Sequence, residues 1–339
     1  MGERKKMINI LCPVDVKTGG TELLHQLAFQ LNQLNVKAQI VYYGKGSNVK
    51  PVRAFEKYIN NNWIKESEVS ESDKNIFIIP ETGLSEFNKF NHGKKYIWWL
   101  SVDNFYGSGF NGYKRINDML RKTGIYHSIG GIIKGRIKNY KKEIKSADFH
   151  LFQSYYADNF LRENGIPENK RTYLSDYIND LYVEKSTTAL EHLRNNIVLY
   201  NPKKGFNFTQ KIIKQSPSWI KWVPLINMSN EEVYKNLISG KLYIDFGNHP
   251  GKDRFPREAA ISGCCILTDK KGSAAYHKDV PILEKYKFED KDENINQIIG
   301  RIEFCLTNYS SAINDFKEYR EYIKQEKQTF KNDVSRIFK

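Results

Sequence analysis

The sequence lacks long hydrophobic runs: no apolar stretch approaches the roughly 20 residues that a helix needs to cross a bilayer. It also has little cysteine. The four cysteines are Cys12, Cys264, Cys265 and Cys305. They form no CxxC pair and have no metal-ligand spacing, which argues against a disulfide framework and a zinc ribbon. The apolar stretch after the charged N-terminus breaks at Pro13 and Asp15, too early for a signal peptide, so we expect a cytoplasmic protein.

Acidic residues are too few to balance the basic ones. Across 339 residues the chain has 53 Lys and Arg against 39 Asp and Glu, a formal net charge of +14. Richness in Lys, Asn and Ile could reflect genomic composition rather than a ligand. Patterns of the RRM, KH, helix-turn-helix and zinc-finger domains are absent, so we expect no specific nucleic-acid partner. The length suggests two domains, because one domain commonly takes about 100–200 residues.

The positive charge is concentrated in residues 130–145, GGIIKGRIKNYKKEIK, which hold six Lys or Arg and one acid. Ile132, Ile133 and Ile137 lie among the basic residues at helix-like spacing. A basic helix that carries apolar residues can lie on an anionic membrane surface or bind an acidic ligand, and it can equally be a solvated helix face. Peripheral contact with the inner face of a membrane is therefore one of two open interpretations of this segment.

The first half of the chain alternates strand and helix patterns. INILCPV (8–14) is rich in β-formers, a Gly-containing turn at 17–20 follows, and then leucines recur at three- and four-residue spacing. AQIVYY (38–43) is the next strand, and this order makes a βαβ unit, which implies a parallel sheet. Further strands are predicted at 75–80, 95–102 and 149–154. Within them, Trp98 and Trp99 alternate faces, and we expect both to pack in the core.

The second half repeats this alternation. Strands are predicted at 196–202, 219–226, 241–247 and 264–269, with helices between them. The polar region 180–195 has no strand pattern and is the expected junction. The sequence therefore predicts two Rossmann-like α/β domains, an acceptor-side domain at 1–182 and a donor-binding domain at 195–309. A helix over 310–339 is expected to pack back on the first domain. Two doubly wound domains would place a ligand at the carboxyl ends of both sheets, across a cleft.

The loop after the predicted strand 241–247 is the most informative segment. Lys252, Arg254 and Arg257 add positive charge where a helix is expected to begin, and the free N–H groups at a helix N-terminus favour an anion. Glu258, expected in the first helical turn, could accept both hydroxyls of a ribose. The alternative interpretation is a charged surface loop with a helix-capping glutamate.

Two other loops follow predicted strands. The lysines of Lys203-Lys204-Gly205 can reach a diphosphate, because an ammonium group binds phosphate as a point charge. Gly19 and Gly20 would form the opposite wall, where the missing Cβ lets the backbone approach phosphate closely. A Gly-Gly pair alone is more often only a tight turn. The three loops together are a stronger indication of a phosphate site than any one of them.

These residues resemble glycosyltransferases of the GT-B fold, in particular the GT4-like group. TGGTELLHQLAFQLNQLNVKAQIVYY (18–43) is similar to their N-terminal Gly-Gly loop and first helix. FPREAAISGCCILTD (255–269) is similar to their donor-site helix and strand, with the pattern P-x-E-A-x-x-x-G-x-x-hydrophobic-Thr. FHLFQSYYADNFLRENGI (149–166) resembles the segment that closes their N-terminal domain. The resemblance covers most of the chain and is loose outside these blocks.

The resemblance and the charge pattern together assign the donor site. The residues expected to bind the nucleotide sugar are Gly19, Gly20, Thr21, Lys203, Lys204, Asn227, Lys252, Arg254 and Glu258. By position in the family, Glu258 would bind the donor ribose, Lys203 or Lys204 the diphosphate, and the loop that contains Asn227 would flank the nucleobase. Retaining members carry a second Glu eight residues before the ribose-binding one, and Pro250 stands there instead. His249, Asp253 or Asp245 lies nearby without matching, so inversion and retention both stay open.

The expected chemistry needs charge stabilisation above all. A nucleotide diphosphate gains negative charge as the glycosidic bond breaks, and fixed cations can stabilise it in place of a metal ion. Arg254 and His249 are the candidate catalytic residues on the donor side, and the resemblance implies no obligatory metal or other cofactor. An inverting enzyme also needs a base for the acceptor hydroxyl. Asp103 is the candidate base, and the alternative for it is an Asx turn or helix cap with Asn104.

We therefore expect a hexosyl-transferring glycosyltransferase that moves a sugar from a nucleotide-diphosphate sugar to a glycan or lipid-linked acceptor, in bacterial surface polysaccharide synthesis. A nucleotide-sugar 2-epimerase of the same fold is an alternative, and it would turn over the donor without an acceptor. A non-enzymatic binding module for acidic polymers is a second alternative. It would explain the charge of the chain and leave the arrangement of Lys203, Lys204 and Glu258 unexplained.

Overall fold

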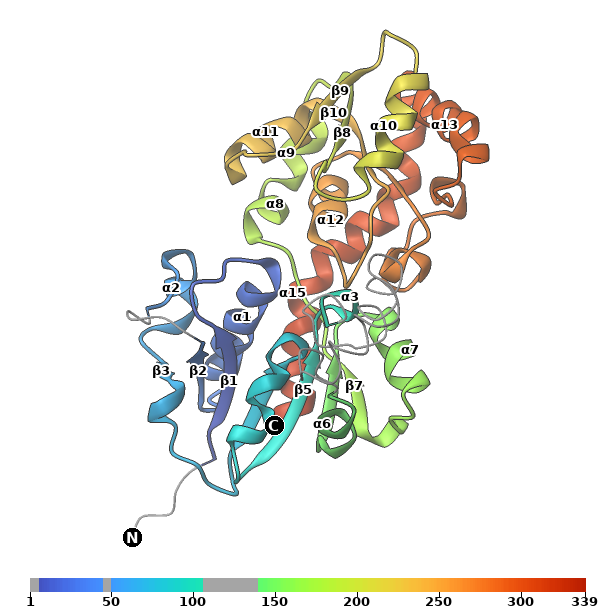
Figure 1. Cartoon of the computed structure of the whole chain (residues 1–339). Helices are drawn as coiled ribbons and strands as arrows, with labels where there is room; N and C mark the ends of the chain where they lie inside the picture. Colours follow the sequence, from blue (N-terminus) through green and yellow to red (C-terminus); the bar gives the residue numbers. More distant parts are fainter. Residues whose placement is uncertain (1–5, 45–49, 106–139) are drawn as a thin grey trace. The chain divides into compact units, whose positions relative to one another are not determined.

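The computed structural model describes residues 6–44, 50–105 and 140–339, and the order of its elements can be followed in Figure 1. The chain divides into two compact units. The first contains Met1–Asp176 and Thr329–Lys339, and the second contains Tyr177–Gln328. Each unit has its own parallel β-sheet with helices in the connections. Among the described helices, none has the length and apolar character that crossing a membrane takes.

The first unit contains a seven-stranded sheet in the order β3-β2-β1-β4-β5-β6-β7, with every pair parallel. Its strands are β1 (Ile8–Pro13), β2 (Ala38–Tyr43), β3 (Trp63–Lys65), β4 (Ile76–Pro80), β5 (Lys94–Trp99), β6 (Phe149–Phe152) and β7 (Arg171–Tyr173). Its helices are α1 (Gly19–Gln33), α2 (Glu56–Ile59), α3 (Val102–Phe105), α6 (Lys141–Ser146) and α7 (Tyr155–Glu163), with the 3-10 segment η3 (Glu81–Lys89). The predicted βαβ start is confirmed.

The buried side chains that pack around this sheet follow the apolar pattern of the sequence. The leucines of α1 repeat at three- and four-residue spacing, and Leu23, Leu24 and Leu27 are buried against the sheet. Trp98 and Trp99 on the interior strand β5 are both fully buried, as expected. The sequence pattern missed β3 and β7, because each is only three residues long and lies at an edge of the sheet.

The second unit contains a four-stranded parallel sheet in the order β11-β10-β8-β9. Its strands are β8 (Asn195–Tyr200), β9 (Lys221–Pro224), β10 (Gly240–Asp245) and β11 (Cys265–Thr268). Its helices are α8 (Asp180–Glu184), α9 (Ser186–Glu191), α10 (Phe206–Gln215), α11 (Asn230–Ser239), α12 (Arg254–Ile261), α13 (Ile295–Thr307), α14 (Tyr309–Ala312) and most of α15 (Lys317–Phe338). All four predicted strands are present, each slightly shorter than its apolar run.

The expected junction and C-terminal helix differ in detail from the structure. The polar region 180–195 has no strand before Asn195, as predicted, but it forms the two short helices α8 and α9. The units divide earlier, between Asp176 and Tyr177. The long C-terminal helix begins at Lys317 rather than near Ser310, after a short helix and a 3-10 turn. The acceptor and donor roles of the two predicted domains stay predictions.

The basic segment 130–145 is described only in its last part. Residues 130–139 lie outside the described residues, so the predicted membrane-facing helix is not placed there. From Tyr140 onward the chain enters α6, where Ile144 is buried and Lys141, Lys142 and Lys145 are exposed.

A buried arginine joins three helix ends in the second unit. Arg194 Nη1 donates to the carbonyls of Leu237 at 3.0 Å and Gly240 at 2.6 Å, at the end of α11. Its Nη2 donates to the carbonyl of Ala189 in α9 at 2.8 Å and to that of Ser262 at the end of α12. Carbonyls in the last turn of a helix lack the usual helical donor, and here one guanidinium donates to the ends of three helices around the sheet.

Candidate active site

Three loops meet at one edge of the sheet in the second unit. Strands β8, β10 and β11 are parallel neighbours, so their carboxyl ends lie on the same edge. The loop after β8 covers residues 201–205, and the loop after β10 covers 246–253 and leads into α12. The loop after β11 covers 269–271 and leads into the 3-10 segment η6 (Gly272–Ala275). The first two are the cationic loops predicted from the sequence.

Glycines let these loops touch through their backbones. Gly205 has φ +57°, and a Cβ there would lie 1.8 Å from the carbonyl oxygen of Phe246. A Cβ on Gly247 would lie 2.4 Å from Cβ of Lys204. Gly272 has φ +52°, and a Cβ there would lie 2.0 Å from the carbonyl oxygen of His249. The three loops are therefore held as one packed layer, which only glycine at these positions allows.

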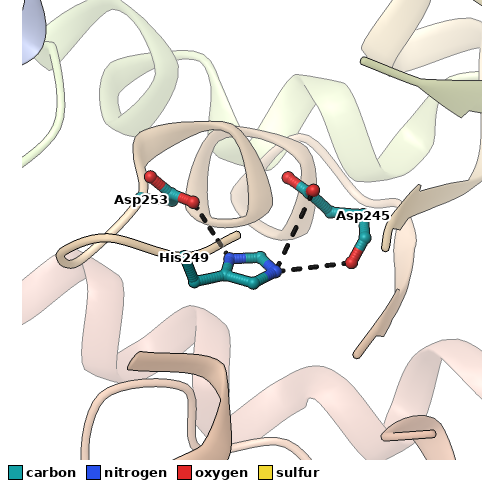
Figure 2. A group of neighbouring side chains, drawn as sticks. All are labelled: Asp245, His249 and Asp253. Carbon is teal, nitrogen blue, oxygen red and sulfur yellow. Dashed lines mark hydrogen bonds and ion pairs between the residues drawn. The ribbon is translucent and has the colours of Figure 1, made fainter. Parts of the chain in front are cut away.

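A buried acid–imidazole cluster lies in this layer (Figure 2). His249 is completely buried, and its Nδ1 lies 2.9 Å from Oδ2 of Asp253. Its Nε2 lies 3.4 Å from Oδ1 of Asp269 and 3.9 Å from Oδ1 of Asp245. Lys204 from the first loop reaches the same cluster, with Nζ 2.6 Å from Oδ2 of Asp253. Two cationic groups thus face three carboxyl groups.

The charges of the cluster shift the pKa values of its members. Burial alone would lower the pKa of His249, but the negative charges of Asp245 and Asp253 outweigh it and raise the pKa to about 9. Burial raises the pKa of Asp269 to about 7. Burial would lower the pKa of Lys204, and nearby Asp253 outweighs burial and raises it. His249 is therefore an imidazolium at neutral pH, held by the surrounding carboxylates.

Asp245, His249 and Asp253 also have the geometry of a possible metal site. Their ligand atoms lie within 4.8 Å of one another, and carboxylate and imidazole groups are common ligands of divalent transition metals. A metal ion there would have to displace the proton of His249 and repel the ammonium of Lys204. Both cations already balance the carboxylates, so the residues fit a protonated cluster better than a metal centre. The expected independence from metal stays a prediction.

The start of α12 differs from the expectation in one respect. The helix begins at Arg254, with Asp253 at the N-cap position. Glu258 is therefore the fifth helical residue and lies in the second turn, not the first as predicted. The glutamate cannot cap the helix from there, which removes the capping alternative for Glu258. Arg254 and Glu258 are both partly exposed.

Lys252 is buried, whereas the sequence suggested a cation that faces solvent. Its side chain is 1% exposed, and Nζ lies 3.0 Å from Oε1 of Glu326. Nζ also donates to the hydroxyl of Tyr322 at 3.0 Å. Lys203, in contrast, is exposed, and its backbone N–H donates to Oδ1 of Asn201 at 3.0 Å, an Asx turn that fixes the start of the loop. Donor-binding roles for both lysines stay predictions.

Asn227, predicted to flank a nucleobase, lies in the loop between β9 and α11. It has φ +54°, a left-handed conformation that asparagine adopts more readily than most residues. Its neighbour Ile226 is 40% exposed. The loop thus presents an apolar side chain next to a fixed backbone turn.

The Gly-Gly pair of the first unit opens a helix rather than forming a turn before it. Gly19 is the first residue of α1, and Thr18 is the N-cap. Thr18 and Thr21 form a capping box: Thr18 Oγ1 accepts from the N–H of Thr21 at 3.2 Å, and Thr21 Oγ1 accepts from the N–H of Thr18 at 2.9 Å. A Cβ on Gly20 would make only an ordinary contact, at 3.5 Å from Leu100. The prediction of a tight turn at Gly19 and Gly20 is therefore wrong, because both residues lie in the first turn of α1, and phosphate contact stays a prediction.

Asp103 lies in α3, four residues after β5 ends, and its Oδ1 accepts from the hydroxyl of Tyr156 at 2.8 Å. The hydroxyl of Ser101, not Asp103, accepts from the N–H of Asn104 at 3.2 Å. Sequence reasoning missed Glu81, directly after β4, which is buried and accepts from the N–H of Leu100 at 2.9 Å. Burial raises the pKa of Glu81 to about 8. An acid directly after an all-apolar strand was the signal that could have found it.

Comparison with known proteins gives no match to a family model and none to a curated protein. Solved structures do match. The sucrose-phosphate synthase of Thermosynechococcus elongatus aligns over 99% of this chain and 98% of its own, with TM-score 0.65 and 10% identity. The lipopolysaccharide outer core galactosyltransferase WaaB aligns over 98% and 99%, with TM-score 0.62 and 10% identity. The chain has the GT-B fold.

A third GT-B structure is that of Anabaena HepE in complex with UDP and glucose. It aligns over 97% of this chain and 98% of its own, with TM-score 0.60 and 10% identity. These matches extend over both units, so the fold class predicted from the sequence is confirmed. At these identities the likeness concerns the fold, and it does not transfer an activity.

Proposed function

We propose that this GT-B chain is a GT4-like glycosyltransferase that takes a sugar from a nucleotide-diphosphate donor. One observation carries the proposal: the loops after β8 and β10 touch through Gly205 and Phe246 at the carboxyl edge of the sheet. This contact brings the loop of Lys203 and Lys204 against the loop that leads into α12. The same edge of an open parallel sheet is where such folds bind ligands. HepE, which shares the fold, has been crystallised with UDP and with UDP-glucose.

In this proposal the donor diphosphate lies between the two loops. Lys203 and Arg254 provide cations that water can reach, and the start of α12 provides the positive end of a helix dipole. Glu258, one turn further along α12, accepts the ribose hydroxyls. The loop of Asn227 flanks the base. Lys204 and His249 hold the two loops together from within the layer, where both pair with Asp253.

The transfer step needs stabilisation of the departing diphosphate. Negative charge grows on the phosphate oxygens as the glycosidic bond breaks, and cations already held in position stabilise it without reorganising. Arg254 is the proposed group at this position. For an inverting reaction Asp103 would take the proton of the acceptor hydroxyl, with Tyr156 orienting its carboxylate through their hydrogen bond. The acceptor is proposed to be a glycan or a lipid-linked glycan of a bacterial surface polysaccharide.

The ribose contact gives the sharpest test of the donor site. We expect Glu258→Gln to weaken binding of the preferred nucleoside diphosphate by roughly tenfold, since a lost hydrogen bond to a charged group costs about 1.5–3 kcal/mol. Glu231→Gln is the matched control, because Glu231 is an exposed glutamate on α11 of the same unit. Equal affinity of both variants and the parent chain, measured by calorimetry, would remove Glu258 from the donor site.

Peripheral membrane contact is proposed separately, from the basic segment 130–145 of the sequence. Vesicles containing anionic lipid should retain the protein at low salt and release it as salt screens the charge. Failure of such vesicles to retain the protein would contradict membrane contact and leave the donor site untouched.

A further inference from the structure

A glutamate of the C-terminal helix lies between two buried cations of the α12 loop. Glu326, on α15, is 3% exposed. Its Oε1 lies 3.0 Å from Nζ of Lys252, and its Oε2 accepts from Nη1 of Arg257 at 2.9 Å. Both cationic side chains are at most 1% exposed. One carboxylate therefore pairs with two cations that water does not reach.

Arg257 also contacts the backbone immediately before α12. Its Nη2 donates to the carbonyl of Lys252 at 2.8 Å, and its Nε donates to the carbonyl of Asp253 at 3.1 Å. The ring of Tyr322 supports the other cation, with Nζ of Lys252 at 4.8 Å from the ring centroid. The backbone of the last two loop residues is thus held by a guanidinium that pairs with Glu326.

The same loop residues hold the acid–imidazole cluster. Asp253, whose carbonyl Arg257 fixes, pairs through its carboxylate with His249 at 2.9 Å and with Lys204 at 2.6 Å. A continuous series of contacts therefore runs from the carboxylate of Glu326 through the guanidinium of Arg257 and the backbone carbonyl of Asp253 to the Asp253 carboxylate, which pairs with Lys204. Removing one partner of a buried ion pair leaves an uncompensated charge, and the surrounding structure has to move or admit water.

We propose that Glu326 is a positioning residue for the nucleotide-diphosphate site. It acts through Arg257 and Lys252, which hold the loop after β10 and with it Lys204 and the start of α12. This inference rests on the function proposed above. Nothing in the sequence pattern of the loop points to Glu326, which lies 69 positions after Arg257 in the chain.

The test compares Glu326→Gln with Glu321→Gln. Glu321 lies on the same helix, is exposed, and pairs with nearby Lys324, so it matches the change in charge at an exposed position. Two quantities are measured at a temperature where both variants are folded: amide hydrogen exchange of residues 246–254, and the Kd of the preferred nucleoside diphosphate. For Glu326→Gln we expect faster exchange confined to this loop and a Kd raised roughly tenfold or more. Glu321→Gln should change neither.

Unchanged exchange in the loop overturns the positioning role, whatever the chain binds. Faster exchange with an unchanged Kd also overturns it, because Glu326 would then serve stability alone. If the parent chain binds no nucleoside diphosphate, the proposed function fails, and so does the role of Glu326 at the donor site. The exchange data would still report whether Glu326 fixes the loop. Should Glu326→Gln not fold, Glu326→Asp keeps the charge with a shorter reach, and it should give a smaller change in the same two quantities.

Discussion

Nδ1 of His249 lies 2.9 Å from Oδ2 of Asp253, and the imidazole is completely buried. Two further carboxyl groups, of Asp245 and Asp269, lie on its Nε2 side, and the ammonium of Lys204 touches Asp253. Burial alone would make this histidine neutral, so the carboxylates decide its charge. The chain therefore keeps a buried imidazolium where the predicted donor loops meet, and this has consequences for pH dependence and for metal binding.

The stability of the fold should depend on pH through His249. Its pKa is raised from 6.5 to about 9, so the protonated form adds stability on the order of 3 kcal/mol below pH 6.5, which is lost as the pH rises through 9. His249→Gln should therefore destabilise the chain strongly at pH 6 and much less at pH 10. Chemical unfolding at the two pH values measures this. The exposed His277, changed in the same way, is the control, and a cost of His249→Gln that does not vary with pH would contradict the imidazolium.

Lys204 should prevent the cluster from binding a metal ion. The parent chain is expected to keep its unfolding temperature in the presence of a chelator or of Mn²⁺, because Lys204 and His249 balance the carboxylates. Lys204→Met removes one positive charge and leaves three carboxyl groups around a single imidazole. We expect Mn²⁺ to raise the unfolding temperature of this variant only. A parent chain that Mn²⁺ stabilises would show a metal site that Lys204 does not block.

Gly205 should tolerate no side chain. Gly205→Ala is expected to destabilise the second unit by at least about 2 kcal/mol, since alanine is strained at φ +57° and its Cβ would meet the carbonyl of Phe246. Gly300→Ala provides the control: Gly300 lies in α13, and a Cβ there meets nothing within 4 Å. That change should stabilise the chain by roughly 0.5–1 kcal/mol. Equal effects of the two changes in urea unfolding would mean that the loops do not touch as described.

Arg194 should be needed for the fold and not for binding. Arg194→Met removes the guanidinium donor from four buried carbonyl groups and leaves those of Leu237 and Gly240 with only the weak thiol donor of Cys264, so we expect a loss of about 3 kcal/mol in the free energy of unfolding. Arg162→Met, at an exposed position on α7, should cost little. Nucleotide affinity below the unfolding transition should be the same in both variants. A stable Arg194→Met protein would show that water replaces the guanidinium.

Most of the fold was predictable, because the strands and α1 rely on local apolar periodicity. Strands β1, β2, β8 and β10 follow their apolar runs within two residues. The start of α12 was predicted near Pro256, but the helix begins at Arg254. The charged residues before Pro256 do not reveal where the helix begins. The loops of Lys204 and His249 could be predicted as neighbours from strand order alone.

The pairing of the charges could not be predicted from sequence. Lys252 looks like a free cation in the sequence, and only long-range packing brings Glu326 to it from 74 positions away. Asp269 follows β11 and reaches His249 for the same reason. Separations of this kind leave no local pattern, because the partner is chosen by how the helices pack on the sheet.

The most direct measurement is calorimetric titration of the full chain with UDP, GDP, CDP, ADP and dTDP in the presence of a chelator. The account predicts that one of these nucleotides binds selectively, that the chelator does not weaken it, and that Glu258→Gln does. Absence of binding by all five, or binding that requires added metal, would contradict a donor site built from Lys203, Arg254 and Glu258.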